Sequence, residues 1–532
     1  MKSIKSLFFV FLLTFSVSSC DDALDITQDG ELGNDVTFKT TKDLEQFLFG
    51  SVYSSVGNTN EIMISASFTD ECGIGPSNGG QELELHRFNL NQTTGYVEAM
   101  WLSHYTVINR ANRLIVAAEN IVPDPSVIIE DYITPGNDIT EVQYYNTILA
   151  QAKALRAYSY FQLLTYFSAD ITDDEALGVM LFENVPAADT KLPRVKNGDV
   201  FALIESDLLF AENNLFNRTD VAGYKFVTKN MINSLRARMY LYRENYPLAK
   251  QYAQDVITNS GLSLTIATPV PAGTVGSQAW NTAFYSDTAT PNPYRRIWSD
   301  LSQGEVLFAL SRPTGGAWGN VAGNFFFNTT TATGGAFLDM GRKLFNELKA
   351  VPGDIRGLAF VDPSSVIDTD YATSDNHITS DVLVIDKYPG KPTQPLRNDI
   401  KLSRLSEMYF ILAECAVFEG QLNVAAGYIK NVMDARNRLG AQPLPNFADV
   451  QTAWAGILKE RRKELCFEGH RYVDIKRLGV LAGVSIDRDP TDDIILTLPT
   501  TISNTDYRFT LPIPQSEIAG NPTIQQNLGY SN

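Results

Sequence analysis

Two stretches of this chain, 234–257 and 409–432, carry the same pattern of small and apolar residues. When Ala237 is aligned with Ala413, a second alanine follows twelve residues later in each stretch. Further aligned positions are apolar in both stretches: Ala253 with Ile429, and Val256 with Val432. Small residues at a fixed register let two antiparallel helices pack closely, but one such pair cannot bury its apolar face alone. The pattern therefore requires several helix pairs that stack on one another.

These paired segments resemble the tetratricopeptide repeat, with generic helical hairpins as the alternative. Two longer segments, 101–120 and 141–168, have apolar residues at spacings of three and four and are also predicted as helices. The repeats lie far apart in the sequence, which excludes one uninterrupted solenoid. We predict a mainly α fold of packed helical hairpins, with the scaffold mainly at 40–260 and 395–480 and with long loops and a few short strands inserted.

Residues 262–340 differ in character from the helical segments. Gly, Thr, Asn, Pro and aromatic residues dominate there, and the helical periodicity disappears. The segment 304–311 (GEVLFALS) is predicted as a strand, and the rest as long loops. Because long loops on a rigid scaffold often carry function, we expect 262–340 to be a loop-rich insert on the ligand side.

The N-terminus resembles a bacterial lipoprotein signal. Lys2 and Lys5 precede an apolar stretch at 7–17, and Cys20 stands where the small-residue cleavage site is expected. The apolar stretch is shorter than the roughly 20 residues that a membrane-spanning helix needs. We predict that residues 1–19 are removed and that Cys20 is lipidated, which anchors the protein without spanning the membrane. An ordinary signal peptide with an incidental cysteine is the alternative.

The charge balance limits the partners. The formal net charge is −18, and nucleic acid rewards clustered Lys and Arg, so we expect no nucleic-acid partner. No later stretch is apolar for long enough to cross a membrane, so the lipid is the only expected membrane contact.

A row of carboxylates provides the one candidate for catalysis. Glu460, Glu464 and Glu468 fall on one face of a predicted helix, and two carboxylates at a suitable separation can hydrolyse a glycoside. Neighbouring cations favour a structural ion-pair network instead: Arg461, Arg462, Lys463 and Arg471.

Other catalytic and metal-binding motifs are missing from the sequence. HExxH, the Walker loop, GxSxG and GxGxxG do not occur. The segment 487–493 (DRDPTDD) lacks the glycine and the terminal glutamate of a calcium loop and is predicted as a solvated acidic loop. We therefore expect no enzyme activity, no metal and no cofactor.

The C-terminal third carries the most specific motifs. The segment 453–479, predicted as one helix, contains ERRKEL, FEGHR and DIKR, and the segment 507–530 contains LPIP, NP and QNLGY. Together with RANRLI at 110–115 and GDIRGLAF at 353–360, these motifs resemble the SusD/RagB family. The resemblance covers nearly the whole chain and implies one SusD-like domain at 20–532, with an α-helical fold built on tetratricopeptide-like pairs.

The same resemblance implies a function and a location. Members of the family are lipoproteins on the surface of the outer membrane of Gram-negative bacteria, where they bind nutrients, usually glycans. Each delivers its ligand to a SusC-like TonB-dependent transporter. A glycan, or another nutrient such as a peptide, is therefore the expected ligand here. The alternatives are a lipid-anchored glycan hydrolase and a helical-repeat scaffold that binds only protein.

A sugar site needs aromatic platforms for the C–H face of the ring and amide or charged groups for the hydroxyls. The insert supplies these types, and we predict five of its residues as ligand contacts: Trp280, Trp318, Asn320, Tyr285 and Tyr294. For both tryptophans a buried structural role is an equal alternative. A second loop at 71–88 adds Asn78 and Gln81 to the predicted contacts and could join the same surface. Three other tryptophans are predicted to pack in the core: Trp101, Trp298 and Trp454.

Overall fold

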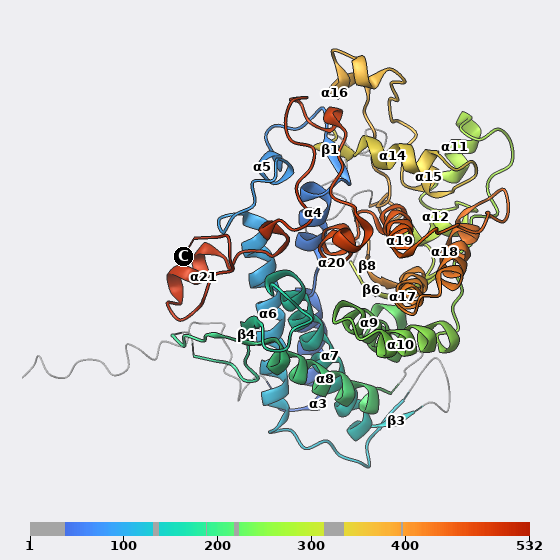
Figure 1. Cartoon of the computed structure of the whole chain (residues 1–532). Coiled ribbons are helices and arrows are strands. Elements are labelled where there is room, and N and C mark those ends of the chain that lie inside the picture. The colour runs from blue at the N-terminus through green and yellow to red at the C-terminus, as the bar shows by residue number, and fades with distance from the viewer. Residues whose placement is uncertain are drawn as a thin grey trace, which may run out of the picture.

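The computed structural model describes residues 38–130, 138–187, 189–216, 223–312, 335–394 and 397–531. In this part of the chain most of the regular structure is helical, and the strands form two-stranded sheets (Figure 1). The predicted mainly α fold is confirmed. None of the helices described has both the length and the apolar character that crossing a membrane requires. The predicted signal, Cys20, Trp318 and Asn320 lie outside the described residues.

A long antiparallel helix pair forms the centre of the N-terminal half. Helix α6 (Gly95–Ala118) lies against α7 (Glu141–Phe167), with Trp101 against Phe167 at one end and Tyr145 bonded to the Ala118 carbonyl at the other. A capping box between Thr140 and Gln143 begins α7. Helix α7 is buried along most of its length because it also packs on α8 (Asn197–Asn214). The predictions of helices at 101–120 and 141–168 are confirmed.

The two predicted hairpins are also present. The first consists of α9 (Lys229–Tyr242) and α10 (Tyr246–Asn259), and the second of α17 (Leu405–Phe418) and α18 (Leu422–Arg436). Helix α10 packs on α17, so the two hairpins stack as the repeat pattern requires. The four aligned alanines are fully buried between these helices: Ala237, Ala249, Ala413 and Ala425.

The segment 453–479 forms two helices, so the prediction of one continuous helix is wrong. Helix α19 (Val450–Leu465) ends before Cys466, and α20 begins at Arg471 (Arg471–Ala482). Phe467 and Gly469 adopt left-handed backbone angles, with φ of 61° and 87°, which a helix cannot contain. The Lys387 ammonium donates to the Glu464 and Cys466 carbonyls that the broken helix leaves without an intrahelical donor.

The insert at 262–340 is more regular than its composition indicates. The predicted strand is β6 (Val306–Leu310), which pairs antiparallel with β8 (Ile400–Arg404). Two short helices, α11 (Gln278–Phe284) and α12 (Pro293–Trp298), were not predicted. The side chains of Ser277 and Asn292 cap them, and both are too short to show periodicity.

An upper layer covers the helix pairs in Figure 1. Strand β1 (Cys72–Ile74) pairs with β7 (Leu338–Met340), and α14 (Arg342–Lys349) and α15 (Arg356–Ala359) follow β7. The remaining helices are α3 (Thr41–Phe47), the π-helix η1 (Leu48–Tyr53), α4 (Thr59–Phe68), α5 (Leu83–His86), η2 (Gly223–Lys225), η3 (Tyr371–Thr373), α16 (His377–Ser380), η4 (Pro490–Asp492), η5 (Tyr507–Phe509) and α21 (Gln515–Gly520). The remaining strands are β2 (Ile128–Ile129) with β3 (Ile139–Thr140), and β4 (Leu177–Met180) with β5 (Arg194–Lys196).

Candidate functional site

The loop after β1 lies against the end of the predicted insert. The Gly75 amide donates to the Phe337 carbonyl over 3.0 Å, next to the antiparallel pairing of β1 with β7. The Asn78 side chain donates to the same carbonyl over 2.9 Å and to the Gln81 carbonyl over 2.8 Å. The structure thus joins the two stretches that the sequence analysis placed on one surface. Asn78 uses its amide to shape the loop, whereas the Gln81 side chain lies exposed.

A pocket of about 670 Å³ lies between this loop and the first turns of α6. Its lining includes one aromatic residue and several residues with amide, hydroxyl or carboxylate groups, among them Asn60, Glu82, Asn89, Asn91, Thr93 and Tyr96. The volume falls in the range of about 300–1,000 Å³ that is usual for small-ligand sites. We call it the 80–99 pocket.

Tyr96 is the aromatic residue of the 80–99 pocket. It lies in the first turn of α6, is half-buried, and its hydroxyl donates to Glu82 Oε1 over 2.7 Å. Burial raises the pKa of Glu82, although the hydrogen bond from Tyr96 acts in the opposite direction. A half-buried ring beside several amides brings together the two kinds of group, aromatic and polar, that bind a sugar.

The sequence analysis did not select Tyr96 or the asparagines near it. The signal that was available is the run NLNQTTGY at 89–96, in which polar side chains lead into an aromatic residue at a helix start. It was not recognised because the aromatic cluster of 280–318 is denser in tryptophan.

Two of the predicted aromatic contacts belong to the core. Trp280 is 1% exposed, stacks on Phe284 with ring centroids 4.7 Å apart, and donates its indole N–H to the Pro271 carbonyl. Tyr294 is fully buried, and the Arg436 guanidinium lies 4.5 Å from its ring centroid. A ring without an exposed face offers no platform for a sugar, so for these two residues the packing alternative replaces the predicted ligand contact.

The hydroxyl of Tyr285 is hydrogen-bonded to the backbone of the protein. Its hydroxyl donates to the carbonyls of Leu358 and Val361 over 2.9 and 3.1 Å. These contacts join the end of α11 to α15, and the half-buried Tyr285 stays a predicted ligand contact. The three tryptophans that were predicted as core, Trp101, Trp298 and Trp454, are all buried.

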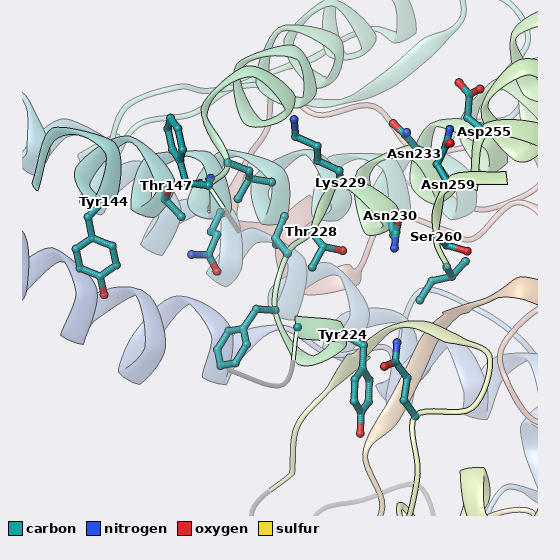
Figure 2. A pocket seen from close by; sticks show the side chains of 18 of the residues that line it. Tyr144, Thr147, Tyr224, Thr228, Lys229, Asn230, Asn233, Asp255, Asn259 and Ser260 are labelled. Atoms are coloured by element: carbon teal, nitrogen blue, oxygen red, sulfur yellow. Dashed lines mark hydrogen bonds between the residues drawn. The ribbon is translucent and has the colours of Figure 1, made fainter. Parts of the chain in front are cut away.

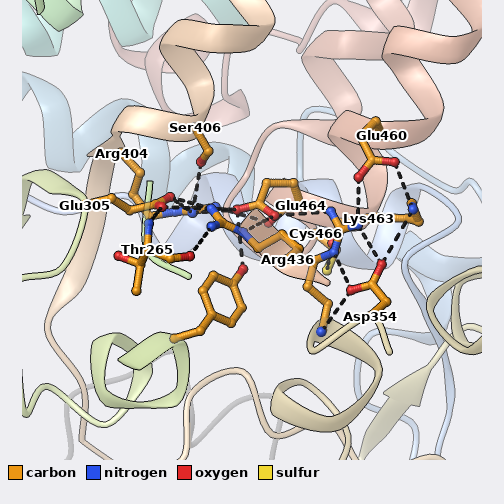
Figure 3. A network of polar contacts seen from close by, with 12 residues as sticks. Thr265, Glu305, Asp354, Arg404, Ser406, Arg436, Glu460, Lys463, Glu464 and Cys466 are labelled. Atoms are coloured by element: carbon orange, nitrogen blue, oxygen red, sulfur yellow. Dashed lines mark hydrogen bonds and ion pairs between the residues drawn. The ribbon is translucent and has the colours of Figure 1, made fainter. Parts of the chain in front are cut away.

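The carboxylate row on α19 is ion-paired (Figure 3). Glu464 is fully buried and accepts hydrogen bonds from Arg404 over 2.8 Å, from Arg436 over 2.9 Å and from Arg356 over 3.2 Å. Burial alone would raise the pKa of Glu464, but the three guanidinium groups hold it well below its usual range. The prediction of a structural ion-pair network is confirmed.

The cations of this network differ from those that the sequence indicated. Of the four predicted neighbours only Lys463 pairs with the row, at 2.8 Å from Glu460. Arg461 pairs with Asp474, and Arg471 pairs with Asp70. The cations that neutralise Glu464 and Glu468 come instead from distant parts of the chain: Arg356, Lys387, Arg404 and Arg436.

The acidic loop at 487–493 is only partly solvated, which corrects the prediction. Asp492 and Asp493 are 5% and 7% exposed; the Arg342 amide donates to Asp492, and the Arg87 side chain pairs with Asp493. Burial raises the pKa of Asp492 to about 7. Within the described residues no cluster of three or more His, Cys, Asp or Glu side chains is arranged to hold a metal ion.

Comparisons with known proteins agree with the helical architecture and with the C-terminal motifs. The model of the SusD family matches residues 363–530. SusD-like protein P38 of Formosa agariphila is 22% identical over 574 aligned positions, which cover 100% of both chains. The chain is similar in sequence to the SusD/RagB family over residues 363–530.

Solved structures of SusD-type proteins share this fold. A SusD superfamily protein from Bacteroides thetaiotaomicron superposes with a TM-score of 0.70 at 24% identity, covering 92% of this chain and 99% of its own. A putative sugar binding protein from Bacteroides vulgatus superposes with a TM-score of 0.67 at 22% identity. The superposition covers 93% of this chain and 100% of the neighbour's chain. The SusD-type fold therefore extends well beyond the 363–530 match.

We expect Trp280→Ala to destabilise this protein by about 3–5 kcal/mol, because the substitution removes a buried, stacked ring and leaves a cavity. Urea unfolding followed by the circular-dichroism signal of the helices, which does not depend on the removed tryptophan, measures the change in the free energy of unfolding. Gln278→Ala is the matched control on the same helix and should change the stability by less than about 0.5 kcal/mol, because Gln278 is exposed. Equal stability of Trp280→Ala and the wild type would contradict the core assignment.

Proposed function

We propose that this protein is a surface receptor that binds glycans without cleaving them. The observation that carries the proposal is the 80–99 pocket, in which the Tyr96 ring lies among amide and hydroxyl side chains. The description of a family neighbour as a putative sugar binding protein supports the same ligand class. The pocket is lined by loops on the edge of a rigid helical scaffold, which is the usual place for a ligand site.

The proposal of binding without hydrolysis rests on the burial and ionisation of the glutamates on α19. Hydrolysis of a glycoside needs one carboxyl that can donate a proton and a second that can attack or activate water. On α19, Glu464 and Glu468 are buried and held ionised by arginine and lysine partners, so neither reaches a substrate. Glu460 is buried as well and bridges Arg356 and Lys463.

We expect Tyr96→Ala to weaken glycan binding about thirtyfold, which corresponds to about 2 kcal/mol for the loss of an aromatic anchor. Affinity electrophoresis on a polysaccharide panel identifies the ligand, and calorimetry measures the affinity. Tyr96→Phe is the matched control: it keeps the ring, loses only the bond to Glu82, and should bind within about tenfold of the wild type. Unchanged binding by Tyr96→Ala, or release of reducing ends by the wild type, would refute the proposal.

We also propose that the protein is lipidated on Cys20, lies on the outer face of the outer membrane, and delivers its ligand to a SusC-like TonB-dependent transporter. The support is the signal-like N-terminus together with the match of residues 363–530 to the SusD family. Trp318 and Asn320 stay predicted contacts of the same ligand; binding by Trp318→Ala in the calorimetric assay tests the tryptophan.

One preparation tests the anchor and the partner together. Native protein purified in mild detergent should carry acyl chains on Cys20 by mass spectrometry and should bring down a large outer-membrane barrel in near-equal amount. A mature N-terminus at another residue would refute the anchor. Recovery of the acylated protein without a barrel from several detergents would refute the transporter complex alone.

A further inference from the structure

A second and larger cavity opens at the opposite end of the α6–α7 pair. It has a volume of about 750 Å³ and lies between the first turns of α7, helices α9 and α10, and the segment 223–228 (Figure 2). Because α6 and α7 are antiparallel, the first turn of α6 at the 80–99 pocket lies beside the last turn of α7. Thr147 in this cavity and Phe167 are separated by roughly 30 Å of helix, at about 1.5 Å per residue. The two pockets are therefore separate sites.

Three asparagines gather at one end of this cavity. Figure 2 shows Asn230 and Asn233 of α9 facing Asn259 of α10, with Asp255 and Ser260 beside them. The Asn233 Oδ1 atom is buried and accepts no hydrogen bond from any described residue. A buried acceptor without a donor costs about 1–3 kcal/mol, so the hydrogen bonding at this end of the cavity is incomplete. The three asparagines form a polar amide cluster in the cavity wall.

Aromatic side chains form the rest of the wall. Phe49 is 37% exposed, and its ring meets Phe226 edge to face with centroids 5.3 Å apart. Tyr224 also lines the cavity, in the lower part of Figure 2. The cavity wall thus contains both aromatic rings and amides, the two kinds of group that the apolar face and the hydroxyl rim of a sugar need.

The charges in the lining favour a neutral ligand. Lys229 and Asp255 contribute one charge of each sign, and the third charged group, Glu45, is already paired with Lys42. An anionic ligand would need an excess of cations, and a cationic ligand would need an excess of carboxylates, so neither is favoured.

We infer that this cavity is a second saccharide site, specific for neutral sugar units and independent of the 80–99 pocket. The inference extends the proposed function, because the ligand class is shared, but it assigns binding to different residues. Two sites on one rigid body raise the avidity for a polymer whose repeats occupy both.

Asn233→Ala is the most direct variant. It removes the unpartnered oxygen, so the melting temperature should stay the same or rise, while the affinity of this site for neutral oligosaccharides falls about tenfold. The double variant Asn230→Ala with Asn259→Ala should give a similar loss. Thr258→Ala is the matched control, because Thr258 neighbours Asn259 on α10 but does not line the cavity.

Hydrogen exchange with a panel of neutral oligosaccharides separates the two sites. The inference predicts ligand protection at 223–233 and 255–260 that Tyr96→Ala leaves intact and Asn233→Ala removes. Protection confined to 80–99 would overturn the second site and leave the proposed function standing. Protection confined to the second site would support the inference and refute the 80–99 pocket. No protection at either segment by any oligosaccharide of the panel would overturn both, and a lower melting temperature of Asn233→Ala would show a structural role instead.

Discussion

The buried carboxylate of Glu464 is the contact on which the rest of the structure depends. It lies on α19 and binds Arg356 at the start of α15, Arg404 at the end of β8 and Arg436 at the end of α18. Glu305, just before β6, neutralises two of these arginines from the other side. Such a cluster adds little net stability over apolar packing, but the loss of one member leaves buried charge uncompensated. The network therefore fixes how segments that are distant in sequence meet.

This arrangement separates support from binding. The hairpins α9–α10 and α17–α18 stack through buried alanines, and the ionic cluster joins α18 and α19 to the upper layer that contains α15. The carboxylates of α19 are thus used for architecture, whereas the linings of the two pockets combine amides, hydroxyls and aromatic rings with a few charged groups. Amides, hydroxyls and rings suit the recognition of a ligand rich in hydroxyl groups.

The sequence predicted the long helices and the stacked hairpins because a helix that buries one face has apolar residues at spacings of three and four. That spacing is visible in a single sequence. The sequence could not identify the partners of Glu464, because Arg356 and Arg404 are separated from it by 108 and 60 residues. It left Trp280 open between packing and ligand contact and wrongly predicted Tyr294 as a contact, since the burial of both results from two short capped helices that leave no periodic signal. Tyr96 has a local polar signal at 89–96, but the sequence could not show that Glu82 and Asn60, from a separate loop and helix, line the same pocket.

The stability of Glu464→Gln tests most directly whether one carboxylate holds these layers together. Urea unfolding followed by circular dichroism and by tryptophan fluorescence should show a loss of about 3–5 kcal/mol in a single transition with both probes, because three buried arginines lose a shared anion. Glu419→Gln, which breaks the surface pair with Lys250, is the matched control and should cost about 1 kcal/mol or less. A Glu464→Gln variant as stable as this control would contradict the account.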